Sequence, residues 1–565
     1  MTTDKTACLI LADVLHSQGV RDVVVSPGSR NAPLTLAFDD KEEMRLTVVT
    51  DERSAAFVAL GLAQASRRPV AVVCTSGSAL LNFSPAVAEA YYQGIPLIVI
   101  SADRPQQWID QDDSQTIRQF EALDNYVKRS YDIPDCEMPE QEQLWLANRL
   151  ANDACLTALS PKQGPVHINV QLHAPLTRPG EPLPPQRVVE TVVPEDRISR
   201  EQARALAEEA DGALILVVAG FMQPDARLNR ALAEFSTLPN VYVLHETIAN
   251  LHIGAGCSAV DTLIGSLSDD ERRRMAPDLV ITVGGALVSR FIKQYLRAFP
   301  PRLGHWSVGH SHTTVDCFKS LTKRIMARPA SFFSRFGGAL ATRLLPQGYA
   351  AEWEMVRQRA FSRHDAYVGT VGWSDMRAMQ TIFSSLRPDI NVQLSNGTPV
   401  RYAQLLQRKT PHAEFCNRGV SGIDGCTSTA VGASLAYGGL TLLITGDLSF
   451  TYDLSALTSA ANASRLRIIV MCNGGGGIFR FVATTASLEE GIREKYFCTP
   501  PAVDPEPLAA AFGLAFMSAS CEEELRQALP RLLGESDRAV ILAVRTPAEE
   551  SATILRNYFN TISDK

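Results

Sequence analysis

Two apolar, strand-like segments in the last third of the chain each lead to a residue with an oxygen atom that can bind a cation. Asp447 follows the segment Leu440–Thr445, and Asn473 follows Leu466–Cys472, 26 residues after Asp447. Because ligands of open α/β sheets bind at the carboxyl ends of the strands, we expect both side chains to project into one crevice. A carboxylate and an amide carbonyl are hard oxygen ligands suited to Mg²⁺. These two residues therefore predict a site for a divalent cation.

Four consecutive glycines, residues 474–477, directly follow Asn473. Since glycine has no Cβ, the main-chain carbonyl and N–H groups of this run can approach a metal ion and phosphate groups closely. Gly446-Asp447 alone is also typical of a helix cap, and the glycine run alone of a flexible loop, but their positions at adjacent strand ends favour a metal–diphosphate cradle. The P-loop sequence G-x-x-x-x-G-K-[ST] does not occur, which argues against a kinase-type phosphate site.

A second acidic motif, Asp51-Glu52-Arg53, lies between the strand-like segment Leu46–Val49 and the alanine-rich helical segment Ser54–Ala65. Acids in this position often serve only the helix dipole, which favours negative charge near a helix N-terminus. The strand end also places Glu52 where a ligand crevice is expected. There, a carboxyl group in an apolar setting can transfer protons to a bound ligand.

Several arginines lie in turn motifs rather than on helix faces. They are Arg30 in Ser29-Arg30, Arg104 in Asp103-Arg104-Pro105, Arg290, Arg401, and Arg418 in Asn417-Arg418-Gly419. A guanidinium group binds a carboxylate through two parallel hydrogen bonds. A single arginine is usually solvated or ion-paired, but the shared positions beside Gly, Pro and Asn at strand ends predict a lining for ligands that carry several carboxylates.

Short apolar segments rich in β-branched residues alternate with Ala- and Leu-rich helical segments, which is the pattern of parallel βαβ units. The segments fall into three sets, so we expect an α/β protein of three tandem doubly wound, mainly parallel-sheet domains. The expected strands are residues 23–25, 46–49, 70–74, 97–100 and 167–170 in the first set, 214–218, 241–244, 279–283 and 304–308 in the second, and 391–394, 440–445, 466–472, 514–517 and 540–544 in the third. The expected helices include residues 54–65, 79–92 and 352–364.

A Pro-rich stretch at residues 175–194 and a second break at residues 345–349 separate the three sets. We therefore expect domains at residues 1–180, 195–345 and 352–565. A chain of 565 residues is too long for one hydrophobic core, which agrees with a division into three domains.

The composition is that of an ordinary soluble protein, with 45% hydrophobic and 20% charged residues. The net charge of −7 argues against a nucleic-acid partner, because duplex binding depends on clustered Lys and Arg. No apolar run approaches the roughly 18 residues that a membrane span needs, and the N-terminus lacks the pattern of a signal peptide. Eleven scattered cysteines without a C-x-x-C pair fit a reducing compartment. We expect a cytoplasmic protein with no membrane span.

Six motifs together resemble a known enzyme family. They are residues 26–34 (SPGSRNAPL), 50–53 (TDER), 75–79 (TSGSA), 101–105 (SADRP), 417–425 (NRGVSGIDG) and 446–449 (GDLS). These stretches are similar to those of the 2-succinyl-5-enolpyruvyl-6-hydroxy-3-cyclohexene-1-carboxylate synthases of menaquinone biosynthesis, which are thiamine-diphosphate-dependent enzymes. The resemblance extends over nearly the whole chain, and the run 417–425 is much longer than a generic motif.

The resemblance implies a transferase that decarboxylates 2-oxoglutarate and adds the resulting carbanion to isochorismate. Thiamine diphosphate and Mg²⁺ or Mn²⁺ would be its cofactors. The first domain would bind the pyrimidine of the coenzyme, and the third domain its diphosphate and the metal. Because different protomers hold the two ends of the coenzyme in this family, a homodimer or homotetramer is expected.

Position by position, the resemblance also implies roles for single residues. Glu52 would be the catalytic acid that activates the aminopyrimidine, and Ile423 would bend the coenzyme from below. The metal ligands would be Asp447, Asn473 and the main-chain carbonyl of Gly475. The substrate pocket would be lined by Ser29, Arg30, Arg104, Gln115, Arg290, Arg401, Arg418 and Phe479.

Three positions depart from the family pattern. Asn396-Gly397 stands where the family has Asn-Ser, so a hydroxyl group that could contact substrate is missing. The metal loop Cys472-Asn473-Gly474 is one residue shorter, and Ser289 replaces a Lys that some members place beside the arginine. The cofactor assignment does not depend on these positions.

Two other functions are compatible with parts of the chain. A decarboxylase or carboligase of the acetolactate-synthase type would use the same coenzyme, but a pyruvate pocket would be smaller and more apolar than one lined by several arginines. A non-catalytic nucleotide- or flavin-binding protein could be built on the middle domain, where Val283-Gly284-Gly285 follows a strand. The dinucleotide fingerprint G-x-G-x-x-G with a downstream acid is absent there.

Overall fold

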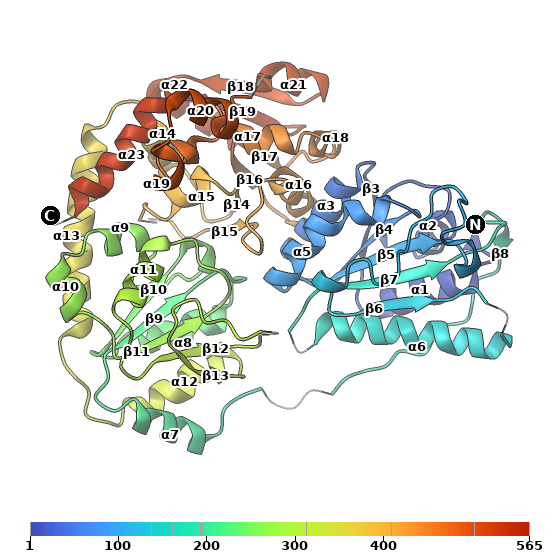
Figure 1. Ribbon diagram of the computed structural model, residues 1–565, viewed down its shortest axis with the longest axis horizontal. Coiled ribbons are helices and arrows are strands. Elements are labelled where there is room, and N and C mark those ends of the chain that lie inside the picture. Colours follow the sequence, from blue (N-terminus) through green and yellow to red (C-terminus); the bar gives the residue numbers. More distant parts are fainter. Residues whose placement is uncertain are drawn as a thin grey trace.

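The computed structural model describes residues 2–136, 138–160, 162–192, 196–311, 313–407, 410–501 and 503–563. Three parallel sheets with helices on their faces follow one another along the chain (Figure 1). The predicted fold class is therefore confirmed. In Figure 1 the N-terminal domain lies on the right, the C-terminal domain at the upper left and the central domain at the lower left. Within the described ranges, no helix is long and apolar enough to cross a membrane.

The N-terminal domain is built on a six-stranded parallel sheet in the order β3-β2-β4-β5-β7-β6. Its inner strands are buried on both faces, which is why they read as continuous apolar runs. The strands are β2 (Asp22–Val25), β3 (Arg45–Val48), β4 (Val70–Cys74), β5 (Leu97–Asp103), β6 (Ser130–Ile133) and β7 (Val166–Gln171). The helices are α1 (Thr6–Ser17), α2 (Ala32–Asp39), α3 (Glu52–Ser66), α4 (Ala79–Asn82), α5 (Ser84–Gln93) and α6 (Glu140–Leu159). A short antiparallel pair joins β1 (Thr2–Thr3) to β8 (Pro179–Gly180).

The C-terminal domain repeats this strand order. Its parallel strands run β15-β14-β16-β17-β19-β18, so each has a counterpart at the same position of the N-terminal sheet. The strands are β14 (Asn391–Leu394), β15 (Ala413–Cys416), β16 (Thr441–Gly446), β17 (Leu466–Cys472), β18 (Ala515–Ala519) and β19 (Val540–Arg545). The helices are α14 (Asp375–Ser384), α15 (Thr398–Ala403), α16 (Cys426–Ala436), α17 (Asp447–Tyr452), α18 (Ala456–Ala460), α19 (Ala483–Ala486), α20 (Glu490–Arg493), α21 (Pro505–Ala511), α22 (Glu522–Leu532) and α23 (Ala548–Ile562).

The central domain has a five-stranded parallel sheet in the order β10-β9-β11-β12-β13. Its strands are β9 (Ile215–Ala219), β10 (Val241–His245), β11 (Leu279–Val283), β12 (His305–Val308) and β13 (Leu321–Ile325). Its helices are α7 (Arg200–Glu209), α8 (Ala226–Phe235), α9 (Val260–Gly265), α10 (Asp269–Arg274), α11 (Arg290–Ala298) and α12 (Pro329–Leu340). The long helix α13 (Tyr349–Thr370) joins this domain to the C-terminal one. Its Trp353 stacks on Tyr242 of β10, and its His364 forms a 2.8 Å hydrogen bond with Tyr558 of α23.

Every strand expected from the sequence is present, with its ends displaced by at most three residues. Beyond the short pair β1 and β8, the described parallel sheets contain three strands that are not predicted, β6, β13 and β15, and each lies at an edge of its sheet. The single helix expected at residues 79–92 is wrong, because the chain breaks at Phe83 and restarts with a proline in the first turn of α5. The expected linker at residues 175–194 is loop apart from β8, and its last two residues lie outside the described ranges.

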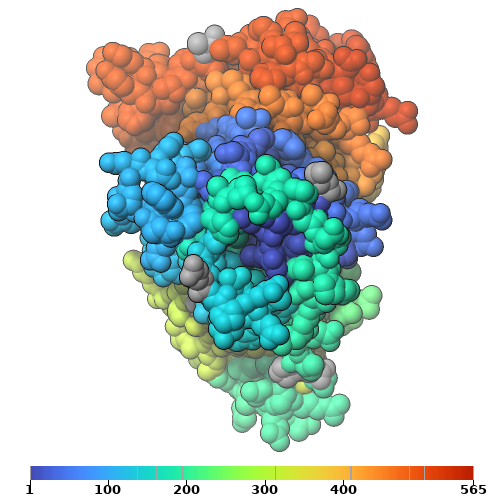
Figure 2. Space-filling view, turned by 90° about the vertical axis from the view of Figure 1, so that its right-hand side faces the viewer, coloured from blue at the N-terminus to red at the C-terminus, as the bar shows by residue number. Residues whose placement is uncertain are grey.

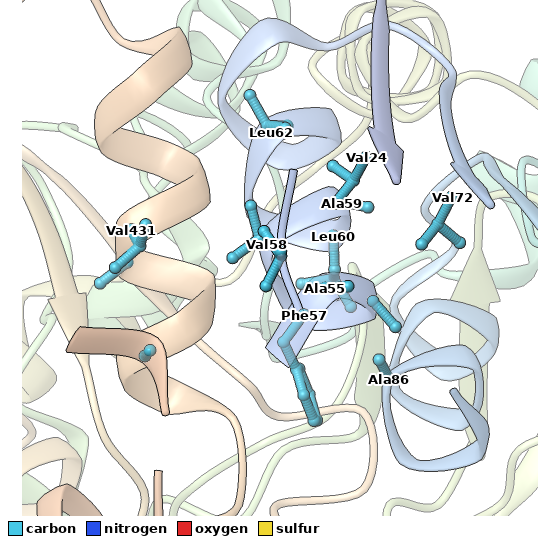
Figure 3. Close-up of a cluster of buried hydrophobic side chains, with 14 of the residues drawn as sticks. Val24, Ala55, Phe57, Val58, Ala59, Leu60, Leu62, Val72, Ala86 and Val431 are labelled. Atoms are coloured by element: carbon cyan, nitrogen blue, oxygen red, sulfur yellow. The ribbon is translucent and has the colours of Figure 1, made fainter. Parts of the chain in front are cut away.

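Helices α3 and α16, which follow the equivalent strands β3 and β15, cross at very short range (Figure 3). A Cβ atom on Gly61 of α3 would overlap the carbonyl oxygen of Thr429, and one on Gly432 of α16 would overlap that of Val58. Only glycine lets the two backbones approach so closely. The contact is thus reciprocal, with each helix supplying one glycine to the other.

The interface between the N- and C-terminal domains is a continuous part of the hydrophobic core. One buried cluster contains Val24 and Phe57 of the N-terminal domain together with Val431, Leu443 and Ile541 of the C-terminal domain. Viewed as in Figure 2, the N-terminal domain lies in front, with the C-terminal domain above it and the central domain below. The two domains with the same strand order therefore share one hydrophobic core.

Candidate active site

The ends of β16 and β17 meet as the sequence predicts, because the two strands are neighbours and run parallel. Asp447, the first residue of α17, lies beside the glycine run that follows β17. Its Oδ2 accepts hydrogen bonds from the N–H groups of Gly474 at 3.0 Å and Gly475 at 2.9 Å. Its Oδ1 accepts from the N–H of Leu448 at 2.7 Å. The carboxylate is thus fixed in place by three main-chain donors.

Asn473 is oriented by a buried acid that the sequence does not single out. Its Nδ2 donates to Oδ2 of Asp375 at 2.7 Å, and Oδ1 of Asp375 accepts from the hydroxyl of Thr546 at 2.5 Å. An amide whose nitrogen is held in this way presents its oxygen on the opposite side. None of the hydrogen bonds between described residues uses this amide oxygen, so it is left for another partner.

The glycine run takes its shape from contacts that other residues could not make. Gly475 has a φ of +102°, and a Cβ atom there would overlap the carbonyl oxygen of Cys498. Arg480 donates to the carbonyl of Asn473 at 3.1 Å and to that of Gly474 at 3.0 Å. The carbonyl of Gly475 accepts only the N–H of Gly477, at 2.8 Å, among the described main-chain bonds. Arg480, which is not among the predicted site residues, therefore binds the carbonyls of Asn473 and Gly474 but not that of Gly475.

The loops that follow β16 and β17 meet at one corner of the C-terminal sheet, which we call the metal corner. Its oxygen atoms fit a hard divalent cation. Burial raises the pKa of Asp447 to about 6, although the N–H groups of Gly475, Leu448 and Gly474 lower it. A desolvated carboxylate of this kind is stabilised by a nearby cation. No group of three or more His, Cys, Asp or Glu side chains is arranged for a metal in the described parts of the chain. The corner differs in kind, because it combines one carboxylate with an amide and a carbonyl oxygen, which Mg²⁺ accepts.

Glu52 is the first residue of α3, and Asp51 caps the helix by accepting from the N–H of Ser54 at 3.2 Å. The Glu52 carboxylate is half-buried and accepts from Nδ2 of Asn82 at 3.3 Å. The helix start is anchored to the C-terminal domain, because the hydroxyls of Ser54 and Ser455 form a 2.7 Å hydrogen bond. Within the single chain, no hydrogen bond between described residues joins Glu52 to Asp447 or Asn473.

Two apolar residues of the predicted site lie on loops of the C-terminal domain. The half-buried Ile423 belongs to the loop between β15 and α16, and its carbonyl accepts from the hydroxyl of Ser449 at 3.0 Å. Phe479 follows the glycine run and packs against Phe497, with 5.8 Å between the ring centroids. Ile423 is thus anchored through its main chain and Phe479 through its ring, both within the C-terminal domain.

Three of the predicted arginines form one group, which we call the C-terminal arginine group. Its members are Arg401 and Arg418 of the C-terminal domain and Arg290, the first residue of α11 in the central domain. Burial lowers the pKa of Arg401, and the positive charges of Arg290 and Arg418 lower it further. Arg418 donates to Oδ1 of Asn396 at 2.9 Å. The buried Nε atoms of Arg401 and Arg418 have no hydrogen-bond partner among the described residues. Two guanidinium N–H donors of this group are therefore unused by the described residues.

The other two arginines lie together in the N-terminal domain. Burial lowers the pKa of Arg30, and the charge of Arg104 acts in the same direction. Arg30 donates to the carbonyl of Leu172 at 2.7 Å, and Arg104 pairs with Asp113 at 3.1 Å. The remaining predicted residues of this pocket, Ser29 and Gln115, are exposed. Within the described single chain, no contact links these residues to the C-terminal arginine group.

Two of the three departures from the family pattern, Gly397 and Ser289, have local structural explanations. Gly397 has a φ of +96°, a left-handed conformation that a serine would adopt only with strain. Ser289 caps α11 by accepting from the N–H of Ile292 at 3.2 Å, and its hydroxyl donates to Asp261. The Ser289 side chain is therefore occupied within the central domain.

Two family models match the chain. One is described as thiamine pyrophosphate enzyme, N-terminal TPP binding domain, and matches residues 5–122. The other is described as thiamine pyrophosphate enzyme, C-terminal TPP binding domain, and matches residues 396–544. The first range contains Glu52, and the second contains Asp447 and Asn473. The fold and the two matches define the class as a thiamine-pyrophosphate-dependent enzyme.

Curated relatives narrow this class. A 2-succinyl-5-enolpyruvyl-6-hydroxy-3-cyclohexene-1-carboxylate synthase of Porphyromonas gingivalis is 40% identical over 99% of this chain and 98% of its own. Synthases of the same name from Christiangramia forsetii and Flavobacterium johnsoniae are 38% and 35% identical, over 96% and 98% of both chains. The chain belongs to the 2-succinyl-5-enolpyruvyl-6-hydroxy-3-cyclohexene-1-carboxylate synthase family. A crystal structure of benzoylformate decarboxylase from Polynucleobacter necessarius shares the fold, with a TM-score of 0.71 and 16% identity over 97% of this chain and 99% of that one.

Proposed function

We propose that this protein decarboxylates 2-oxoglutarate and adds the remaining four-carbon unit to isochorismate, as a thiamine-diphosphate-dependent synthase of menaquinone biosynthesis. Relatives that cover nearly the whole chain carry the name of this synthase. The observation that carries the proposal is the C-terminal arginine group, whose buried Nε atoms on Arg401 and Arg418 lack partners among the described residues. Guanidinium groups in this state bind carboxylates strongly.

The alternative enzyme, of the acetolactate-synthase type, fits the same residues less well. Pyruvate carries one carboxylate, whereas 2-oxoglutarate and isochorismate each carry two. A pocket for pyruvate has no need to bring three arginines together. Burial, and after it the charges of Arg290 and Arg418, lower the pKa of Arg401, so this arrangement has a cost. The number of substrate carboxylates therefore favours the synthase.

The corner of the C-terminal sheet is the proposed site of Mg²⁺ or Mn²⁺ and of the diphosphate. Asp447, the amide oxygen of Asn473 and the carbonyl of Gly475 would hold the metal. Other contacts orient these groups, and an oxygen that accepts one hydrogen bond keeps a second lone pair for a cation. Bound thiamine diphosphate supplies the nucleophilic carbon and the electron sink for decarboxylation. The residues around it orient the coenzyme, and Ile423 and Phe479 keep water away.

Glu52 holds and moves the proton at the ring nitrogen of the aminopyrimidine. Its position at the start of α3 is rigid, because Asp51 caps the helix and Ser54 is bonded to Ser455. Arg30 and Arg104, with Ser29 and Gln115, bind substrate from the N-terminal side. The C-terminal arginine group binds carboxylates from the other side.

A second copy of the chain completes each site in this proposal, as a homodimer or homotetramer. Glu52 and the metal corner belong to two domains whose relative position is set by the reciprocal glycine contact of α3 and α16. The family resemblance, in which different protomers hold the two ends of the coenzyme, supports a site that pairs Glu52 of one copy with Asp447 of the other. The partners are otherwise small molecules, and the eleven free cysteines support a cytoplasmic location.

Release of carbon dioxide from 2-oxoglutarate tests the proposed function. With thiamine diphosphate and Mg²⁺ present, we expect release to depend strongly on added isochorismate. Equal release without isochorismate would indicate a simple decarboxylase, and consumption of pyruvate in preference to 2-oxoglutarate would favour the acetolactate-synthase type.

A further inference from the structure

A buried glutamate of the N-terminal domain accepts hydrogen bonds from the loop that carries Arg418. Glu89 lies in the middle of α5 and is 1% exposed. Its Oε1 accepts from the N–H of Gly419 at 2.6 Å, and its Oε2 accepts from the N–H of Val420 at 2.7 Å. Gln93, one turn further along α5, donates a third hydrogen bond to this carboxylate.

The fit between α5 and this loop is close. A Cβ atom on Gly419 would lie 2.6 Å from the carbonyl oxygen of Glu89 and 2.9 Å from its Oε1. Gly419 directly follows Arg418, whose guanidinium group is bonded to Asn396. Arg418 is therefore fixed at both ends, by Asn396 at the guanidinium and by Glu89 at the main chain.

A carboxylate is the side chain that suits this contact. Two successive N–H groups need two acceptor oxygens, and glutamine offers one oxygen and an NH₂ group that cannot accept. Burial raises the pKa of Glu89, while the bonds from Val420, Gln93 and Gly419 and the charge of Arg418 lower it. A buried acid is costly unless such partners compensate it. The hydrogen bonds to the loop supply that compensation.

The central domain contains the same arrangement beside a second arginine of the group. Glu246 is 1% exposed and accepts from the N–H groups of Val288 at 2.8 Å and Ser289 at 2.7 Å. These residues directly precede Arg290. Two arginines of the C-terminal arginine group thus lie next to a pair of main-chain N–H groups that a buried glutamate holds.

We propose that Glu89 is a positioning residue for Arg418, so that α5 of the N-terminal domain sets the carboxylate-binding geometry of the C-terminal domain. This inference rests on the proposed function. Glu89 reaches no substrate itself, and it acts by holding the main chain on one side of the arginine. Its loss frees the loop and weakens carboxylate binding more than it slows the chemical step.

Steady-state kinetics of Glu89→Gln test the proposal. Arg418→Ala first identifies the substrate whose KM depends on this arginine. We expect Glu89→Gln to raise the KM for that same substrate about tenfold, as the loss of one charged hydrogen bond does, with a smaller change in kcat and in affinity for thiamine diphosphate. An unchanged KM in a folded variant would overturn the proposal.

A double-mutant cycle separates positioning from general loss of stability. If Glu89 acts through Arg418, then Glu89→Gln has no further effect on KM in an Arg418→Ala background. Additive effects on KM would overturn the proposal. The matched control is Glu271→Gln, which removes another buried, hydrogen-bonded glutamate. Glu271 pairs with Arg359 of α13, which is not a member of the arginine group. It lowers the unfolding temperature and leaves KM unchanged.

Gly419→Ala provides the test from the other side of the contact. The added methyl group meets Glu89 and displaces the loop while the carboxylate remains, so KM for the same substrate rises here too. If Glu89→Gln does not fold, an unchanged KM in Gly419→Ala would overturn the proposal. Absence of isochorismate-dependent carbon dioxide release in the unaltered protein is a separate result, which would refute the proposed function instead.

Discussion

The N- and C-terminal domains share one strand order but carry different chemistry at corresponding strand ends. In the N-terminal domain, β5 leads into Asp103-Arg104, an arginine suited to carboxylates. In the C-terminal domain, the counterpart β17 leads into Asn473 and the glycine run, which offer oxygen atoms to a cation. The comparison teaches that the sheet topology specifies where a site lies, whereas the residues just beyond each strand specify what it binds.

The pairing of the two domains is as informative as their difference. Each domain bonds to a segment of the other: the main-chain carbonyl of Tyr452 accepts from Arg53 in the first turn of α3, and Glu89 accepts from the N–H of Gly419 beside Arg418. The start of α3 and the loop that follows β15 are thus anchored by the opposite domain. The contact between the two domains therefore positions the segment beside Glu52 and the segment beside Arg418 together.

The largest expected effect comes from the metal corner. Asp447→Asn removes the charge on which cation binding depends, so turnover is lost and thiamine diphosphate with Mg²⁺ no longer stabilises the protein. In the unaltered protein, saturating coenzyme raises the free energy of unfolding by about 3 kcal/mol at 100 times its Kd. Thermal unfolding with and without coenzyme measures this difference. An equally large coenzyme-dependent rise in the unfolding temperature of Asp447→Asn would refute the metal-binding role of Asp447.

Glu52→Gln tests the role of the N-terminal domain, which is proton transfer rather than metal binding. We expect turnover to fall by at least about 100-fold, because a general acid–base group is lost. Coenzyme-dependent stabilisation persists, since the diphosphate and metal are held by the other domain. Full activity in Glu52→Gln, measured by carbon dioxide release, would refute the proton-transfer role.

The domain pairing itself is tested by Gly432→Ala. The added Cβ overlaps the carbonyl oxygen of Val58, and such overpacking costs about 1–3 kcal/mol of stability. Gly438→Ala is the matched control, because no atom lies within 4 Å of the Cβ that it adds. Denaturant unfolding of the two variants should differ, and equal stabilities would show that the helices separate without cost.

The smallest expected effect concerns stability and comes from an ion pair outside the N- and C-terminal domains, between Glu271 of the central domain and Arg359 of α13. The hydrogen bond from Arg359 lowers the pKa of Glu271 from 4.5 to about 2. Because the folded pKa is depressed, the stabilisation is complete above the ordinary pKa and is lost as the pH falls through the folded one. Glu271→Gln therefore lowers the unfolding temperature at pH 7, and the difference shrinks in strong acid. A difference that does not vary with pH would contradict this ion pair.

The framework of the three sheets could be predicted from the sequence, because inner strands such as β17 and β11 are continuous apolar runs. The edge strands β6, β13 and β15 could not, since they are short and mix apolar with polar or charged side chains. In β6, Asp132 accepts from Asn169 at 2.9 Å, and in β15 the buried Glu414 pairs with His412 at 2.9 Å. These residues look like loop positions when only local periodicity is considered.

The site shows the same division. Asp447 and Asn473 could be placed together because each follows a recognisable strand. Asp375, which orients Asn473, lies 98 residues before it, and Glu89 lies 330 residues before Gly419. No local spacing predicts such contacts. One usable signal for Glu89 was an acid within the alanine-rich segment of α5, where a buried charge requires a partner.

Complementation between two inactive variants tests the central claim, that an acid of one chain and the metal corner of another form one site. Glu52→Gln and Asp447→Asn chains, carrying different tags, are co-expressed and the mixed dimers are purified. One site of each mixed dimer then receives both substitutions and the other receives neither. We expect close to half of the unaltered activity in isochorismate-dependent carbon dioxide release. Mixed dimers as inactive as either parent would contradict a site shared between chains.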